Sequence, residues 1–178
     1  MDTLQKPKRR KFIRIASTGA LATSVGGLPA LLGSSIAHAQ QVLGDDTFAT
    51  LTKIARDIFP HDRFEDDLYR KAVAPYGDPA KQDAALKTLL TEGVASVDVA
   101  ANQKYGKRYV EVVDEKDRVA ILKAMDKSPF FLKVRGDLVV SLYNQPAVWA
   151  KLGYQGPSAE FGGYITRGFN DQTWMDSV

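Results

Sequence analysis

The chain has 178 residues, enough for one domain of modest size. Hydrophobic residues make up 44% and charged residues 25%, which are ordinary globular values and exclude bulk disorder. It contains no cysteine, so disulfide bonds, haem attachment through its own thiols and thiolate-held iron–sulfur clusters are excluded.

The formal net charge of +3 comes from the beginning of the chain. The first 39 residues hold six of the 24 basic residues and one of the 21 acidic residues, so the remainder is slightly negative. The basic isoelectric point is therefore no sign of nucleic-acid binding, and we expect no nucleic-acid partner.

The first residues follow the pattern of a twin-arginine export signal. Arg9 and Arg10 lie in a basic cluster just before Phe12. An apolar run follows over residues 15–32, but serine, threonine, glycine and proline residues make it too broken for a stable membrane-spanning helix. This order predicts recognition by the Tat translocase, which carries proteins that are already folded, and delivery to the periplasm.

Ala37 and Ala39 complete this signal, because two small residues around a third form a signal-peptidase site. We therefore predict that residues 1–39 are a cleaved leader and that the mature chain starts at Gln40. The alternative is a retained leader that acts as a membrane anchor, which the broken apolar run disfavours.

Beyond the leader, apolar residues recur with a helical period. A first stripe runs from Phe48 to Ile58 and is ended by Pro60. A second, short helix is predicted over residues 66–76, with Gly77 as its stop.

The rest of the predicted helices follow with short links. Asp78, followed by proline, should cap a long helix that reaches Tyr105, and Asp114 should open the next. Ser128 precedes a helix with a clear apolar stripe, and a last short helix is predicted over residues 146–152. The prediction is an all-α protein: a small bundle of five to six helices over residues 40–153.

Residues 154–178 differ, because they combine several glycines with aromatic side chains. Glycine opposes helix, whereas aromatic side chains favour burial. This tail should therefore lie on something, either its own bundle or a partner protein. The predicted partner-contacting side chains are the aromatic residues of this region: Trp149, Tyr154, Phe161, Tyr164, Phe169 and Trp174.

Side chains suited to chemistry are scarce. His61 is the only histidine after the leader, and we interpret it as a turn residue, with the acidic residues that follow it as a solvated turn. These acids lack the spacing of a calcium loop, and no nucleophile motif accompanies the histidine. We predict no catalytic residue, no metal site and no cofactor in this chain.

Several segments resemble the gluconate 2-dehydrogenase subunit 3 family. They are Ile58–Asp62, Ser128–Phe131, the Tyr-Asn-x-Pro-x-Val-Trp run Tyr143–Trp149, the Leu-Gly-Tyr-x-Gly-Pro run Leu152–Pro157, and Gly162–Tyr164. The resemblance spans most of the chain after the leader, and a twin-arginine leader is typical of the family.

The resemblance implies a small, non-catalytic subunit of a periplasmic flavin-dependent dehydrogenase. Its large partner would be a glucose-methanol-choline-type flavoprotein that holds FAD and oxidises a sugar, sugar acid or alcohol. A haem c subunit often accepts the electrons and can hold such a complex at the membrane. The small subunit commonly carries the only Tat signal, so the folded flavoprotein is exported attached to it.

Two other functions stay open from the sequence. The chain is alternatively a stand-alone periplasmic binding or scaffold protein, or, with less support, a small enzyme that works through His61.

Overall fold

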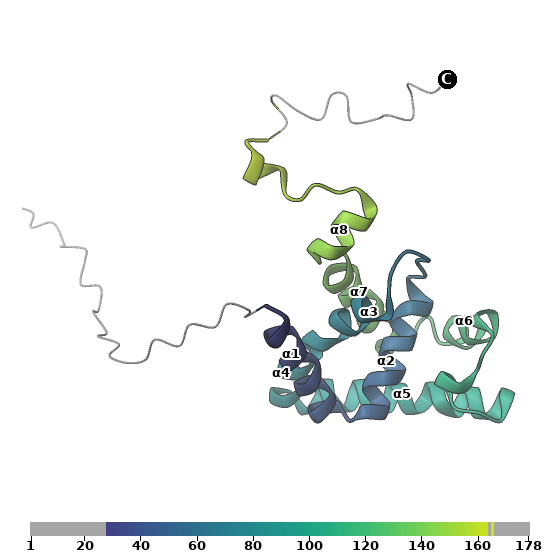
Figure 1. Ribbon diagram of the computed structural model, residues 1–178. Coiled ribbons are helices and arrows are strands. Elements are labelled where there is room, and N and C mark those ends of the chain that lie inside the picture. The colour runs from purple at the N-terminus through teal and green to yellow at the C-terminus, as the bar shows by residue number, and fades with distance from the viewer. Residues whose placement is uncertain (1–27, 164, 166–178) are drawn as a thin grey trace, which may run out of the picture.

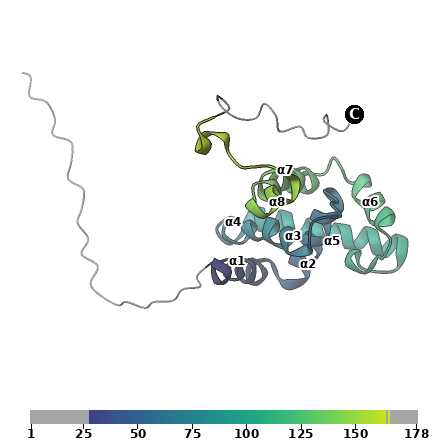
Figure 2. The same ribbon diagram turned by 45° about the horizontal axis from the view of Figure 1, so that its top comes forward.

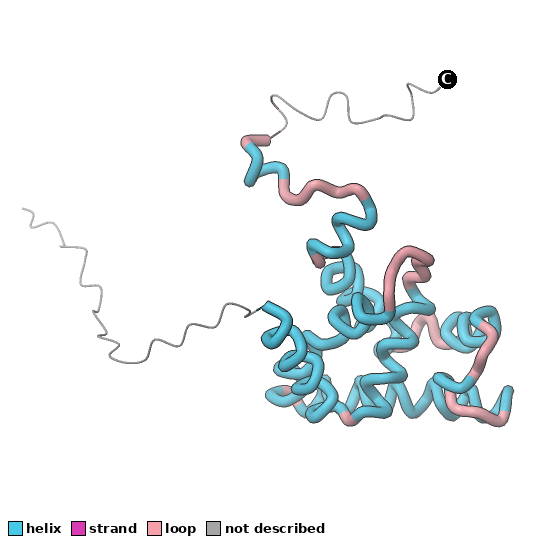
Figure 3. The backbone as a smooth tube through the Cα atoms, in the orientation of Figure 1, coloured by secondary structure: helices cyan, strands magenta, loops and turns pink. Residues whose placement is uncertain are grey.

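The computed structural model describes residues 28–163 and residue 165. The described chain is helical without strands, in agreement with the predicted all-α bundle (Figures 1 and 3). It contains more helices than the five to six predicted. The elements are α1 (Leu28–Leu43), α2 (Asp45–Ile58), α3 (Asp66–Val73), η1 (Ala74–Tyr76), α4 (Gly77–Gln82), α5 (Ala84–Tyr105), η2 (Tyr109–Glu111), α6 (Glu115–Ala124), α7 (Pro129–Tyr143), α8 (Pro146–Leu152) and η3 (Ser158–Phe161).

The long helix α5 runs along one side of the bundle, with α1 and α4 at one end of the molecule and α6 at the other (Figures 1 and 2). Helices α2, α3 and α7 contact one another above it. One continuous core joins these layers, and its most deeply buried side chains include Leu51, Tyr69, Leu90, Leu138 and Val148. Burial of this apolar surface is the main contribution to the stability of the bundle.

Capping side chains fix where the later helices begin. The carboxylate of Asp83 accepts hydrogen bonds from the backbone of Ala85 and Leu86, at 2.8 and 3.2 Å, and so starts α5. Asp114 caps α6 and Ser128 caps α7, as the sequence predicts. The long helix predicted from residue 78 is therefore two helices, because Asp83 adopts an extended backbone and caps the second.

The prediction that Gly77 stops a helix is wrong. Gly77 has a helical backbone, with φ of −58°, and opens α4. A Cβ atom at this position would lie 3.0 Å from the Cα of Ala39. Glycine is therefore suited to this position because α1 passes very close to α4, not because the chain turns there.

Gly93 has a comparable role in α5. A Cβ atom there would lie 2.1 Å from the ring of Phe130, the first buried residue of α7. The glycine weakens α5 locally, yet it lets the phenylalanine ring lie directly on the helix backbone.

The helical body begins upstream of residue 40, where the sequence placed its start. Helix α1 passes through the predicted cleavage site and contacts α2, α3, η1 and α4. Ile36, Ala39 and Leu43 recur at helical spacing and turn towards the core, and this stripe holds α1 on the bundle.

Candidate interaction surface

Two segments that are far apart in the sequence meet at one end of α7. The loop after α2 carries His61, and its Nε2 atom shares a hydrogen bond of 2.7 Å with the hydroxyl of Tyr143, the last residue of α7. The two rings meet edge to face with centroids 5.7 Å apart, and Phe59 meets the ring of Tyr143 at the same distance. Both segments belong to the motifs that carry the family resemblance.

Further aromatic contacts extend this cluster in both directions. Phe64 lies against His61, with ring centroids 4.3 Å apart. On the other side, the indole Nε1 of Trp149 donates a hydrogen bond of 2.6 Å to the carbonyl of Tyr143, and its ring meets Tyr154 edge to face. We call the set Phe59, His61, Phe64, Tyr143 and Trp149 the aromatic junction.

Polar contacts fix α8 beside the junction. The amide of Gln145 donates to the carbonyl of Leu68, at 3.0 Å, and Lys151 lies 2.8 Å from the carboxylate of Glu65. Val148 is fully buried. Helix α8 is therefore attached to α3 as well as to α7, which gives the tail a rigid origin.

The outward side of α7 exposes three large apolar side chains alongside the charged residues Lys133 and Arg135. Leu132, Val139 and Val140 expose 54%, 52% and 65% of their surface, and Gly136 between them has open space where a side chain would stand. Leu132 and Val139 are seven residues apart and so share one side of the helix. We call Leu132, Val139 and Val140 the outer face of α7. A group of exposed apolar side chains on one side of a helix is a candidate surface for contact with another molecule.

The end of α8 and the chain after it also expose apolar side chains. Gly153 ends α8 with φ of 76°, and Leu152, Tyr154 and Ile165 expose 52%, 48% and 86% of their surface. In Figures 1 and 2 the described part of the tail, through η3, leads away from the bundle instead of crossing it.

The other predicted site residues are partly within the described structure. Ala37 is exposed on α1, whereas Ala39 is fully buried. The export-signal residues Arg9, Arg10 and Phe12, the side chain of Phe161, and the aromatic residues Tyr164, Phe169 and Trp174 lie outside the described residues.

The histidine and most of the acids near it have defined polar contacts. Burial raises the pKa of Tyr143, so its hydroxyl stays protonated beside His61. Three of the nearby acids pair with bases on other turns: Asp66 with Arg56, Asp67 with Lys71 and Glu65 with Lys151. Within residues 28–163 and 165, no three His, Asp or Glu side chains converge as a metal ion would need.

A second polar group was missed by the sequence reasoning. Asp57 of α2 accepts two hydrogen bonds from Arg118 of α6, at 2.7 and 2.8 Å, and a third from the hydroxyl of Tyr109. Arg118 also donates to the carbonyls of Val112 and Val113. The side chains of the ion pair are 1% and 5% exposed, so this buried network joins α2, η2 and α6.

The signal for this network was weak, because Arg118 lies within a charged stretch of α6 that reads as solvent-exposed. Burial of the Tyr109 hydroxyl raises the pKa of Tyr109, and the adjacent carboxylate of Asp57 raises this pKa further. Every charged group in it is paired, and we assign it to stability rather than to function.

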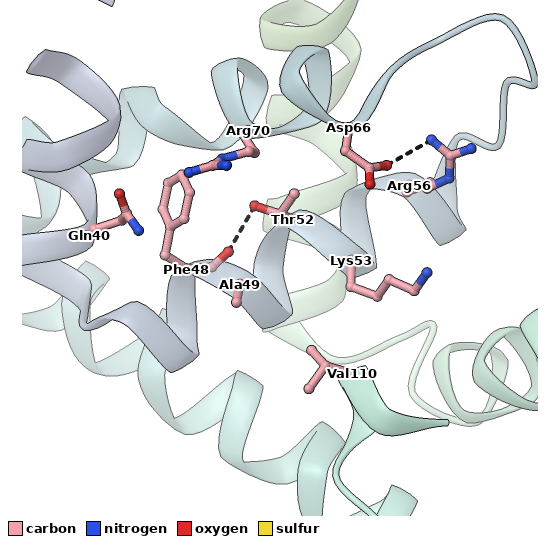
Figure 4. A pocket seen from close by; sticks show the side chains of 9 residues that line it. All are labelled: Gln40, Phe48, Ala49, Thr52, Lys53, Arg56, Asp66, Arg70 and Val110. Carbon is pink, nitrogen blue, oxygen red and sulfur yellow. Dashed lines mark hydrogen bonds and ion pairs between the residues drawn. The ribbon is translucent and has the colours of Figure 1, made fainter. Parts of the chain in front are cut away.

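A surface hollow of about 380 Å³ lies between α2 and the neighbouring elements (Figure 4). Lys53 and Arg70 meet no acidic partner among the residues that the structure describes, whereas Arg56 is paired with Asp66. The hydroxyl of Thr52 donates to the carbonyl of Phe48. The hollow can attract an anion, but it holds no pair suited to acid–base or nucleophilic catalysis. Its lining residues are Gln40, Phe48, Ala49, Thr52, Lys53, Arg56, Asp66, Arg70 and Val110.

The described residues form an all-α bundle, and α7 exposes apolar side chains on its outer face. In comparisons with known proteins, no protein-family model, no curated protein and no solved structure matches the chain. Among the helices of the described chain, none is long and apolar enough to cross a membrane.

Proposed function

We propose that this chain is the non-catalytic small subunit of a periplasmic, FAD-dependent dehydrogenase of the glucose-methanol-choline type. It binds the folded flavoprotein in the cytoplasm, takes it through the Tat pathway and stabilises it afterwards. FAD belongs to the large subunit, and a c-type cytochrome subunit, where present, accepts the electrons and holds the complex at the membrane. This chain itself needs no cofactor.

The observation that carries the proposal is the outer face of α7. A small bundle that has already buried a continuous core still presents Leu132, Val139 and Val140 to solvent. Burying these apolar side chains against a partner, away from water, would be favourable. The face ends at the aromatic junction, where the two quoted motifs of the family resemblance meet.

The absence of cysteine supports the same function. A Tat substrate folds in the cytoplasm, where disulfides do not form, and this chain requires none. A flavin is inserted before export, so a flavoprotein that lacks its own signal needs a folded escort.

Export of the partner tests the proposal. Replacing Arg9 and Arg10 together by lysine should leave both this chain and the flavoprotein in the cytoplasm, because the arginine pair is the part that the translocase recognises. Immunoblots of cytoplasmic and periplasmic fractions measure it, with Lys8→Arg as a control that keeps the pair. If the flavoprotein still reaches the periplasm while this chain does not, the escort function is wrong.

The tail has two possible roles, and deletion of residues 158–178 separates them. If the tail docks on the flavoprotein, the shortened protein keeps its helical circular dichroism and its melting temperature but loses the partner. If the tail covers its own bundle, the shortened protein melts at a lower temperature. Unchanged affinity for the flavoprotein would rule docking out.

A further inference from the structure

We propose that α1 is a permanent element of the exported protein and that the bond between Ala39 and Gln40 is not cleaved. That bond lies inside a continuous helix that extends from Leu28 to Leu43. A peptidase must hold its substrate as an extended segment, so cleavage at this position requires α1 to unfold locally.

Burial makes this local unfolding unfavourable. Ala39 has no exposed surface, and Leu43, one turn further on, exposes only 5%. Both belong to the core, together with Tyr76 of η1 and Ala80 of α4. Detaching α1 would return this apolar surface to water.

Helix α4 has a glycine at the place where it contacts Ala39 of α1. Gly77 leaves room for the backbone of Ala39, since a Cβ atom there would lie 3.0 Å from the Cα of Ala39 and 3.1 Å from its nitrogen. Next to this contact, His38 Nε2 lies 3.0 Å from the carboxylate of Asp78. A segment that is removed after export would need no such complementary site in the domain.

Export of a folded protein would make cleavage within α1 less favourable still. A protein that crosses the membrane folded has formed α1 before it meets a peptidase on the far side. The inference rests on the leader in the proposed function, but not on the flavoprotein partner. Its consequence is that the mature chain begins upstream of Leu28 and that α1 helps to stabilise it.

The test is the intact mass of the full chain, carrying a C-terminal tag and purified from the periplasm. The expected mass is that of a chain that begins before Leu28. A chain that begins at Gln40, or at any residue within α1, would overturn the proposal, and so would a chain that never reaches the periplasm. The partner plays no part in this readout, so a failed partner pull-down leaves it unaffected.

Two variants at the predicted cleavage site sharpen the result. Ala37 is exposed, so Ala37→Leu should leave the melting temperature unchanged. The mass should differ only by the substituted side chain, because the mature chain still begins at the same residue. Ala39→Gly keeps a small residue that a peptidase accepts, yet it removes a buried methyl group and weakens the helix, so the purified protein should melt a few degrees lower. If residue 39 were removed in the mature protein, Ala37→Leu would block processing and Ala39→Gly would leave the melting temperature unchanged.

Discussion

The buried network around Asp57 and the aromatic junction around His61 differ in burial and in surroundings. The network of Asp57, Tyr109 and Arg118 is enclosed, and every charge in it has a partner. The aromatic junction around His61 and Tyr143 is half-buried and lies beside the exposed outer face of α7. A polar contact between residues far apart in the sequence therefore does not by itself mark a functional site. The exposed apolar side chains beside a contact are the feature that distinguishes a candidate interaction site from a contact that only stabilises the fold.

The largest expected effect falls on the buried network. Arg118→Met should lower the free energy of unfolding by about 3–5 kcal/mol, because it leaves the buried carboxylate of Asp57 without its charge partner. Urea unfolding measures the loss. The matched control is Arg70→Met, an exposed arginine on α3, which should change stability by less than about 0.5 kcal/mol. A small effect at Arg118 would mean that the network does not hold α2 and α6 together.

A substitution on the outer face of α7 should weaken partner binding and leave the stability of the bundle nearly unchanged. Val139→Asp should leave the melting temperature nearly unchanged and weaken flavoprotein binding by about 100-fold or more, because an unpaired charge would be buried in the interface. Val99→Asp on α5 is the matched control, since Val99 is 55% exposed and Val139 is 52% exposed. Equal binding by the two variants, measured by titration, would exclude the outer face as the docking surface.

At alkaline pH, the free energy of unfolding should depend mainly on the buried tyrosines. Burial first, and then the carboxylates of Asp57 and Asp137, raise the pKa of Tyr109 and of Tyr76, so both hydroxyls are protonated in the folded state. Their stabilisation is fully present below the unfolded-state pKa of about 10 and is lost as the pH rises above it. Tyr109→Phe should cost about 1 kcal/mol at pH 7 and make unfolding less steeply dependent on pH above about 10. Denaturant unfolding between neutral and alkaline pH measures both, and an unchanged slope would contradict this view of Tyr109.

The sequence predicted the fold class and most helix limits, because apolar periodicity and caps such as Asp114 and Ser128 are local signals. It missed the break at Asp83 and the role of Gly77, because both depend on which helix lies next to them. The partner of His61 was also hidden, since Tyr143 is 82 residues away and neither residue is unusual in its own helix or loop. The exposed side of α7 was overlooked because its valines fit a helix with or without a partner.

The smallest expected effect is on catalysis. His61→Ala in the assembled, flavin-loaded complex should leave the turnover number within a few-fold of the unmodified complex, because we interpret His61 as a residue that positions Tyr143 and not as a general base. A general base usually contributes about 10²–10⁴-fold, so its loss would be plain in a steady-state assay. A decrease of that size, with the complex intact, would make this chain part of an active site.

The escort function is tested most directly by a pull-down of the tagged full chain from the periplasm, followed by an absorption spectrum of the eluted material. A large chain should co-purify in equal amount and show the absorption bands of a bound flavin. Val139→Asp should remove that chain from the eluate, whereas Val99→Asp should retain it. If both variants elute alone as colourless proteins, this chain does not bind a flavoprotein through α7.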